Sequence, residues 1–486
     1  MKNYALTLIA LIITISSIAQ DKWDLKRCVD YAVKNNVSVR QADVQARITA
    51  LQLKQAKYAK IPSINFSPNI GFQFGRSIDP TTNQFTTTQL LYQGMALQGG
   101  LQIFGFGMVK QNIHANEYYT KAAYTDIERY ANDVSLSVAS YYLQVLSAKE
   151  QIKIVEVQVS QTKSQYDITK KKVDAGALPE LNLAELESQL ASDSSNLITA
   201  QSNFDLSILT LKGVLNLDAA VPFELDTPPV DKIPIEPIAD LQPDAVFGMA
   251  INNQPLQKSN ALRIKGAESA IKANKATLYP NFYLGYNLAS SFSNPTRSVD
   301  YNSVTVIGKT PTSYFVDVNG ANYNVFQPQV QYDQIKRSFF SLWDGYWTQM
   351  DQNFRQAVGL TMTVPIFNNT GSYKISYQRS KLDLQNLKVQ QEGADLKLKN
   401  DVYTAYTNAT ASMQKYFMGF KTVETAQKAY DYASKRYEVG LLSTIDLITN
   451  QNSLLRAKLQ QLNNQYDYVF KMKLLEFYKG QGIRLE

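Results

Sequence analysis

Residues 64–74 read INFSPNIGFQF, and this stretch decides the fold because the spacing of apolar residues changes here from helical to alternating. The even positions hold Ile64, Phe66, Pro68, Ile70, Phe72 and Phe74, whereas the odd positions hold Asn65, Ser67, Asn69, Gly71 and Gln73. A period of two places these two sets on opposite faces of a β-strand. We therefore predict a strand over about 62–76 with one apolar and one polar face.

Three further segments alternate in the same way, at about 90–104, 280–290 and 353–367. Such segments are typical of a lipid-embedded sheet around an aqueous lumen, and the alternative is a soluble antiparallel sheet packed on a core. Four strands leave two free edges, and the smallest membrane barrels have about eight strands. In lipid the missing strands would come from identical copies around a closed rotational axis.

The chain is a duplication, because sliding the sequence on itself by 264 residues aligns a long stretch. The aligned pairs include Tyr166 with Tyr430, Gly176 with Gly440, and Leu183 with Leu447. A repeat of this length indicates two copies of one structural unit. We predict repeats at 21–220 and 244–486, joined by a proline-rich linker at 221–243.

Each repeat has the same predicted order: helix, strand, loop, strand, very long helix, tight turn and returning helix. The opening helices are expected over about 25–60 and 244–278, with corresponding turns at Asn35-Asn36 and Asn252-Asn253. The helical hairpins are expected over about 107–215 and 373–478.

The long helices lack internal proline, and their apolar residues follow coiled-coil steps of three and four. This spacing includes Val134, Val138, Tyr141, Val145, Ala148, Ile152, Val155, Val159, Thr162, Tyr166, Thr169 and Val173 in the first copy. The second copy has it at Val402, Tyr406, Ala409, Met413, Tyr416, Phe420 and Val423. About 65 helical residues would span on the order of 100 Å, which is typical of a tunnel wall rather than a globular domain.

The first 20 residues have the pattern of a secretory signal peptide, with Lys2 before an apolar run from Ala5 to Ile18. The alternative is a transmembrane anchor, for which the run is short. Beyond this segment no run approaches about 18 uninterrupted apolar residues, so any membrane crossing by the mature chain is expected to consist of strands. The single cysteine, Cys28, is expected to be a buried structural thiol.

Several functional classes find little support. The formal net charge of +7 comes from basic residues interleaved with acidic ones, so no nucleic-acid partner is expected. The one histidine, His114, lies on a polar helical stretch, and the sequence has no metal-ligand spacing of Cys and His. Gly105-Phe106-Gly107 lacks the third glycine of a dinucleotide site. We expect no catalytic residue, no cofactor and no metal.

Two loops join the strands, at about 76–89 and 291–351. The first is rich in threonine, and the second is long enough to contain structure of its own. Its end carries Phe339, Phe340, Trp343, Tyr346 and Trp347. Three interpretations of this aromatic cluster stay open: a girdle at the lipid interface, a plug, or a hydrophobic cap.

Over nearly the whole mature chain, the residues resemble the TolC-like outer-membrane factors, the outer membrane efflux protein family. The resemblance rests on Trp23-Asp24-Leu25, Tyr279-Pro280, Val364-Pro365-Ile366-Phe367, and above all on residues 436–447, RYEVGLLSTIDL. The first-copy counterpart, residues 173–183, is a looser match. Residues 101–104, LQIF, lack the proline of their second-copy partner.

The resemblance implies a mainly α-helical homotrimer in the outer membrane of a Gram-negative bacterium. Its three sets of four strands would form a twelve-stranded barrel, continuous with a periplasmic helical barrel. Such a channel conducts substrates passively after docking to a periplasmic adaptor (membrane fusion) protein and an inner-membrane pump of the resistance-nodulation-division or ABC type. The alternatives are an exported coiled-coil protein without a pore and a porin for diffusive uptake; the sequence does not indicate the cargo.

The resemblance also assigns site residues. The hairpin tips that would dock the adaptor are Ala175, Gly176, Ala177, Leu178, Val439, Gly440, Leu441, Leu442 and Ser443. Asp446 occupies a position where the family has an acidic ring that gates the periplasmic end and favours cations. Thr449 stands where some members have a second acid, so a double ring is in doubt. The alternative for Asp446 is a carboxylate that stabilises a helix N-terminus.

Overall fold

The computed structural model describes residues 22–78, 85–86, 89–226, 233–367 and 369–480. The predicted signal peptide, residues 1–20, lies outside the described residues. The chain divides into two compact units, each built from separate stretches of the sequence. Of the described residues, those within 1–53, 114–270 and 379–486 form the helical unit, and those within 54–113 and 271–378 form the sheet unit.

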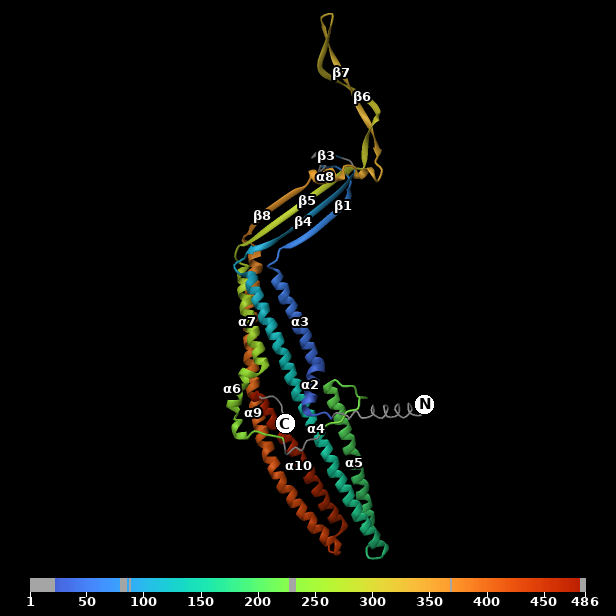
Figure 1. Cartoon of the computed structure of the whole chain (residues 1–486), viewed down its shortest axis with the longest axis vertical. Helices are drawn as coiled ribbons and strands as arrows, with labels where there is room; N and C mark the ends of the chain where they lie inside the picture. Colours follow the sequence, from blue (N-terminus) through green and yellow to red (C-terminus); the bar gives the residue numbers. More distant parts are fainter. Residues whose placement is uncertain (1–21, 79–84, 87–88, 227–232, 368, 481–486) are drawn as a thin grey trace, which may run out of the picture. The chain divides into compact units, whose positions relative to one another are not determined.

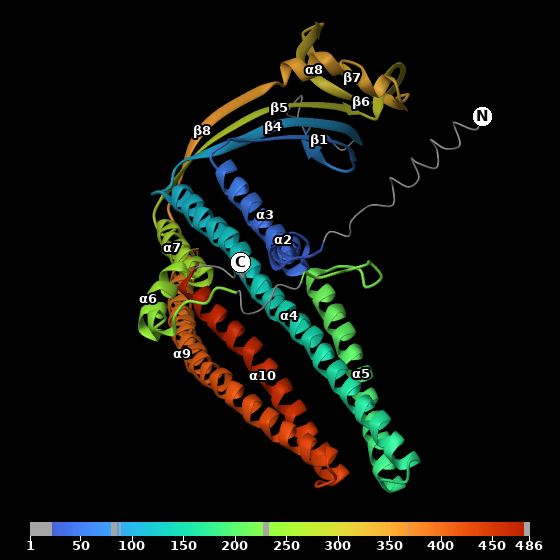
Figure 2. The same cartoon turned by 60° about the horizontal axis from the view of Figure 1, so that its bottom comes forward.

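Two hairpins of long helices form most of the helical unit. In the first, α4 (Met108–Asp174) is followed by α5 (Glu180–Leu215). In the second, α9 (Asn369–Glu438) is followed by α10 (Thr444–Lys479). Figure 2 shows the turns of both hairpins at the same end of this unit. The predicted mainly helical fold with a duplicated order of elements is confirmed.

The heptad positions predicted on α4 face its neighbours: Val138, Val145 and Thr162 are at most 1% exposed. On α9 the same spacing is wrong at one position, because Phe420 is 52% exposed. The neighbouring Gly419 is buried instead, and a Cβ there would lie 1.7 Å from Oε1 of Gln461 on α10. The absence of a side chain at residue 419 therefore lets α10 place a glutamine against α9.

Each predicted opening helix is divided into two, which corrects the expectation of continuous helices. The first comprises α2 (Leu25–Asn35) and α3 (Val37–Tyr58), and the second α6 (Pro243–Asn253) and α7 (Pro255–Ala276). Asn36 is extended, and its Oδ1 accepts a hydrogen bond from Ser38 N at 2.9 Å, which caps α3. Gln254 is extended because a helical conformation is disfavoured before proline. The first break lies at Asn36, within the predicted turn, and the second lies at Gln254, one residue after the predicted Asn252-Asn253 turn.

One apolar core joins α2, α4, α5 and α10 in the helical unit. It includes Cys28, Tyr142, Leu211, Leu215 and Val469. Cys28 is fully buried, and burial raises the pKa of its thiol to about 12. The prediction of a buried thiol is confirmed by this burial, and a pKa raised this far leaves almost no thiolate at neutral pH.

The described parts of the linker pack on this core. Trp23 N donates to Glu224 O at 2.9 Å, and Tyr142 Oη donates to Asp226 O at 2.7 Å. Further on, the amide of Glu236 donates to Glu476 Oε1, and Lys479 donates to the carboxylate of Glu236. These contacts hold the linker against α4 and α10.

The sheet unit contains one four-stranded antiparallel sheet in the order β1-β4-β5-β8 (Figure 1). Its strands are β1 (Ser63–Gln73), β4 (Leu90–Phe104), β5 (Asn281–Pro295) and β8 (Arg355–Thr363). Each repeat supplies two neighbouring strands. The edge strands are β1 and β8, and neither is paired on its outer side within the described chain.

The two faces of the sheet differ as the alternation predicts. Phe66 lies opposite Leu97, which lies opposite Leu288, so these apolar side chains share one face. Asn65 lies opposite Gln98, which lies opposite Asn287, on the other face. On the apolar face, large side chains are exposed, including Ile64, Phe66, Ile70, Phe72, Val358, Leu360 and Met362.

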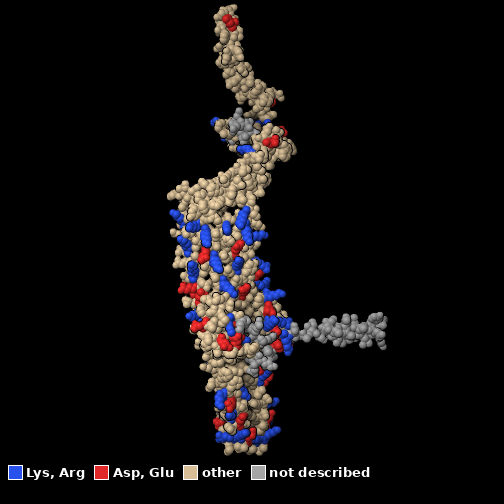
Figure 3. Space-filling model, turned by 60° about the vertical axis from the view of Figure 1, so that its left-hand side comes forward, with Lys and Arg blue, Asp and Glu red and all other residues tan. Residues whose placement is uncertain are grey.

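The sheet is almost free of charge, whereas the helices carry many charges of both signs, as the face drawn in Figure 3 shows. Arg355, the first residue of β8, is the one charged residue in the four sheet strands. Among the described residues, no helix is both long enough and apolar enough to cross a membrane.

The predicted loops contain additional structure. The first holds the short strands β2 (Ser77–Ile78) and β3 (Phe85–Thr86). The second begins later than predicted, because β5 continues to Pro295. It contains the hairpin of β6 (Arg297–Val318) and β7 (Ala321–Lys336), the short 3-10 helix η3 (Ser341–Trp343), and α8 (Tyr346–Gln352).

The aromatic cluster at the end of this loop lies partly against the apolar face. Trp343 stacks on Phe292 with ring centroids 5.6 Å apart, and Tyr346 contacts the same ring edge-on. Asn294 Nδ2 holds the segment by donating to Leu342 O and Asp344 O. Phe339, Phe340 and Trp347 remain exposed. The segment therefore covers the end of β4 and β5 and presents three aromatic rings to the surroundings.

Candidate functional site

The tips of the two helical hairpins have the same turn geometry. Gly176 and Gly440 have φ of 72° and 78°, a left-handed conformation that costs little only for glycine. The amide following each glycine bonds back to the helix: Ala177 N donates to Lys172 O, and Leu441 N donates to Arg436 O, both at 2.8 Å. The glycines therefore end α4 and α9 and permit the tight return of α5 and α10.

The second tip is closed by a reciprocal cap. Asp446 N donates to Ser443 Oγ at 3.2 Å, and Ser443 Oγ donates to Asp446 Oδ2 at 2.6 Å. The first tip has Pro179 at the equivalent position, with no side-chain cap. Asp446 is exposed and lies in the first turn of α10. The geometry thus matches a carboxylate that stabilises a helix N-terminus and also leaves its charge at the surface.

The predicted docking residues are mostly exposed. Val439 and Leu441 are each 69% exposed at the second tip. Leu178 and Leu442 are half-buried, and Leu442 packs on the small core of Tyr430, Tyr437, Leu447 and Leu454. The remaining predicted tip residues, Ala175, Gly176, Ala177, Gly440 and Ser443, are exposed. The tips therefore present apolar side chains and glycine turns at the surface.

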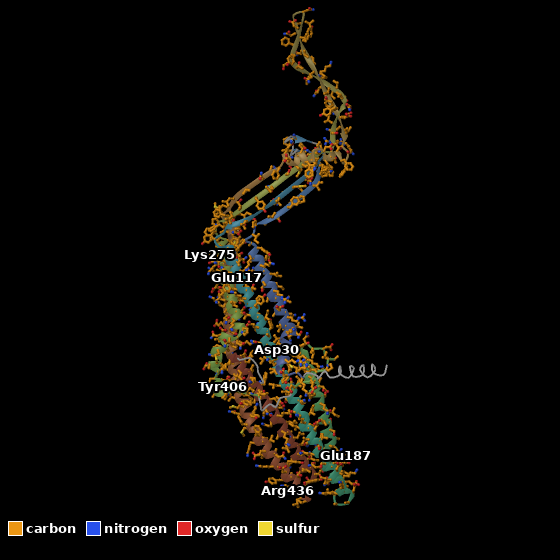
Figure 4. All side chains as sticks on the ribbon, viewed as in Figure 1. Asp30, Glu117, Glu187, Lys275, Tyr406 and Arg436 are labelled. Atoms are coloured by element: carbon orange, nitrogen blue, oxygen red, sulfur yellow. The ribbon has the colours of Figure 1, made fainter. Side chains whose placement is uncertain are left out.

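A row of hydrogen bonds near the tips joins α4 to α9. Gln165 Nε2 donates to Tyr430 Oη at 2.7 Å, and the hydroxyls of Thr169 and Tyr437 lie 3.0 Å apart. Burial raises the pKa of Tyr430, so its hydroxyl stays protonated at neutral pH. Lys172 Nζ donates to the carbonyl of Glu438. Glu438 follows Arg436 by two residues, and Arg436 is labelled in Figure 4 near the second tip.

A buried carboxylate lies farther along the hairpins. Asp193 on α5 is 0% exposed and accepts hydrogen bonds from Thr162 Oγ1 at 2.6 Å and Gln189 Nε2 at 2.8 Å. Gln189 also exchanges two hydrogen bonds with Asn452 on α10. These contacts link the two hairpins of one chain. The sequence analysis did not find them, because Thr162 appears in the sequence simply as a heptad position.

Between α4, α5 and α10 lies a groove of about 530 Å³. Its wall is mostly amide and hydroxyl side chains, with Arg456 as the charged residue. The groove residues are Gln151, Val155, Gln189, Ser192, Asn196, Thr199, Ala200, Asn203, Asn452, Leu455, Arg456 and Leu459.

His114 lies apart from the tips on α4, where Nδ1 is 3.1 Å from Glu117 Oε2 and the side chain is 43% exposed. In the part of the chain that the structure describes, no group of three or more His, Cys, Asp or Glu residues is arranged to hold a metal ion.

Comparison with known proteins agrees with this architecture. The model of the family described as "Outer membrane efflux protein" matches residues 29–217 and 345–478, which is more than half of the chain. A curated relative, the toxin and drug export protein A of Aggregatibacter actinomycetemcomitans, is 21% identical over 355 residues. That match covers 73% of this chain and 65% of the relative, so the chain spans less than two thirds of the relative's length.

Solved structures share the fold at low sequence identity. The structure of CusC, reported with changes that accompany folding and transmembrane channel formation, matches with a TM-score of 0.72 and 15% identity, covering 94% of this chain and 92% of that one. The outer membrane protein VceC from Vibrio cholerae matches with a TM-score of 0.68 and 14% identity, covering 95% and 97%. The chain is therefore an outer-membrane protein that belongs to the outer membrane efflux protein family.

Proposed function

We propose that this chain is one of three identical protomers of an export channel that crosses the outer membrane and the periplasm. One observation carries the proposal: the sheet β1-β4-β5-β8 has an exposed apolar face, a single charged residue, and two edges without a partner strand in the described chain. Lipid is the surrounding in which such a face is stable. The polar face must then meet water inside the membrane, and this requires that the strands close into a ring around an aqueous lumen.

The free edges explain why one copy is not enough. In lipid, each unpaired backbone N–H or C=O costs several kcal/mol, so β1 and β8 need partners. Pairing β8 of one copy with β1 of the next satisfies both edges by rotation, and three copies supply twelve strands. Phe66, Ile70 and Leu360, which are 61%, 60% and 63% exposed, then face lipid. Each gains roughly 1.5–3 kcal/mol on leaving water.

The helices also carry apolar seams that one chain leaves open. On α3, Val37, Val44, Leu51 and Tyr58 follow one another at intervals of seven and are all at least 50% exposed. On α9, Ile375, Leu382, Val389 and Leu396 have the same spacing and are all at least 59% exposed. Heptad seams of this kind bind a neighbouring helix. We assign them to contacts between protomers that close a helical barrel.

The hairpin tips are the proposed docking surface for a periplasmic adaptor protein. Exposed Val439 and Leu441, together with Ala175 and Ala177, offer small apolar knobs around glycine turns. An adaptor helix with matching apolar positions would bury them, and the adaptor would in turn engage an inner-membrane pump of the resistance-nodulation-division or ABC type. The chain itself is proposed to be a passive conduit without catalysis.

Asp446 is the proposed gate residue. Its exposed carboxylate would be repeated three times around the axis of a trimer, where the like charges repel one another and attract cations. Its hydrogen bond with Ser443 holds that charge at the start of α10. Cargo is proposed only as a class: the name of the relative from A. actinomycetemcomitans supports toxins and drugs.

Two measurements on one detergent-purified sample of the mature chain test the proposal. Light scattering is expected to give the mass of three chains, and planar bilayers are expected to show discrete ion-conducting steps. A chain that stays soluble without detergent and conducts no ions would instead be an exported coiled-coil protein.

A further inference from the structure

The middle of the β6–β7 hairpin has one apolar and one polar face, and no part of the proposed channel accounts for it. Strand β7 alternates from Phe326 to Asp333: Phe326, Pro328, Val330 and Tyr332 point to one side, and Gln327, Gln329, Gln331 and Asp333 to the other. The residues opposite the first set are apolar in three of four positions, Pro311, Val306 and Val304, and the fourth is Lys309. We call the side of Val304, Val306, Pro311, Phe326, Pro328, Val330 and Tyr332 the apolar hairpin face.

Within the described chain this face is largely open, apart from an edge-on contact between the rings of Tyr301 and Tyr332. Val304, Val306 and Phe326 are 50%, 60% and 54% exposed. The hairpin is drawn in Figure 1 as a two-stranded ribbon. Isolated two-stranded hairpins are at best marginally stable in water, and a third strand or a packed face is needed. The apolar hairpin face therefore requires a partner.

The ends of the hairpin connect it to the sheet whose edges need further copies of the chain. Only Thr296 separates β5 from β6. Its amide donates to Gln89 O at 2.7 Å, and its carbonyl accepts from Arg337 N at 2.9 Å, just beyond β7. Each copy in the ring of sheets thus adds one hairpin at the same level. The apolar hairpin face is therefore directly connected to the strands that form the proposed interface between protomers.

We infer that three β6–β7 hairpins, one from each protomer, pack their apolar faces together into a six-stranded collar at the end of the channel. The inference rests on the proposed trimer. Outer-leaflet lipid fits this surface less well, because segments that lie on membranes are rich in basic residues. Here β6 and β7 carry three basic residues, Arg297, Lys309 and Lys336, and three acidic ones, Asp300, Asp317 and Asp333.

Single cysteines test which surface the apolar hairpin face meets. Val306→Cys and Phe326→Cys place a thiol on this face, and Thr305→Cys and Gln327→Cys place one on the polar face beside each. The native Cys28 is buried with a pKa of about 12, so it does not compete. The full-length variants in membranes are oxidised with copper phenanthroline, and disulfide-linked dimers are scored on non-reducing gels.

Dimers are expected for the two apolar-face cysteines and only background for the two polar-face controls. Equal cross-linking on both faces, or none on either, in a sample that light scattering shows to be trimeric overturns the collar and leaves the channel standing. A monomeric sample overturns both. A fluorophore attached to the Val306→Cys variant that spin-labelled lipid quenches, without cross-linking, assigns the face to lipid and also overturns the collar.

Discussion

Gln451 on α10 donates a hydrogen bond from Nε2 to Thr162 Oγ1 on α4 at 2.8 Å, and both side chains are at most 1% exposed. The same hydroxyl donates to the buried carboxylate of Asp193 on α5 at 2.6 Å. One threonine therefore connects three helices from both hairpins. A polar contact without access to water is worth more than a surface one, because each group left unpaired keeps its full desolvation cost.

Replacing Thr162 by valine is expected to destabilise the helical unit by about 1–3 kcal/mol, because Asp193 loses a donor that water cannot replace. A lower midpoint in urea denaturation followed by circular dichroism would show this. Thr199 provides the control, since its side chain is exposed and its hydroxyl donates to Ser195 O within α5. Equal midpoints for Thr162→Val and Thr199→Val would contradict the role of the buried network.

Alanine at Gly440 is expected to cost about 1 kcal/mol, because a Cβ strains the left-handed backbone although no atom lies within 4 Å of it. Gly393 offers a matched control within α9, where φ is ordinary and the space is also open. Alanine there is expected to stabilise the helix by about 0.5–1 kcal/mol. The measurement is the change in denaturation midpoint, which is expected to be a decrease for alanine at Gly440 and an increase for alanine at Gly393. Changes in the same direction would contradict the turn geometry.

Asp446→Asn is expected to lower cation selectivity and to increase leakage at the periplasmic end, because the proposed charge ring is lost. Ser443→Ala separates this effect from helix capping. It removes the hydroxyl that accepts from Asp446 N, at a cost of about 1 kcal/mol, and leaves the carboxylate charged. Reversal potentials in planar bilayers under a salt gradient measure selectivity. Unchanged selectivity in Asp446→Asn would remove this residue from the gate.

Lysine at Phe66, on the apolar face of β1, is expected to impair membrane insertion by about 2–4 kcal/mol if it lies near the bilayer midplane. Lysine at the adjacent Ser67, on the polar face, is expected to be tolerated because that side chain meets water. The yield of folded protein in outer-membrane fractions compares the two variants. Similar yields would mean that the sheet does not have lipid on one side and water on the other.

Leu51→Glu is expected to break the α3 seam, because a carboxylate would be buried at a position that is 64% exposed in one chain and covered in the proposed trimer. Gln52→Glu is the control, at the next exposed position outside the seam. Analytical ultracentrifugation in detergent is expected to show loss of the trimer for Leu51→Glu alone. Trimers that persist in both variants would place the seam outside the interface.

How much the sequence predicts depends on the range of the interaction. The alternation from Ile64 to Phe74 and the glycines at the tips are local signals, so strand faces and turns follow from them. The break after Asn35 was visible as a turn, but not as a full division of the helix. Phe420 was predicted to face the neighbouring helix but is exposed, because Gly419 faces Gln461 on α10 instead, a contact between distant residues.

The candidate site divides in the same way. The positions of Gly176, Gly440 and Asp446 follow from the repeat and the tip motif, whereas the cap from Ser443 to Asp446 required coordinates. The network of Asp193, Thr162 and Gln451 joins residues far apart in the sequence, and no spacing rule predicts it. The amphipathic β6–β7 hairpin escaped notice because three bulges in β6 interrupt its alternation.

The central claim is that sister copies pair the two free edges of the four-stranded sheet in the outer membrane. The most direct test is the mass of the mature chain, measured by light scattering on detergent-solubilised protein from the outer membrane. Three chains per particle are expected, since the edges must be paired by sister copies. A monomer in detergent, or recovery of the protein from periplasmic fluid instead of the outer membrane, would contradict it.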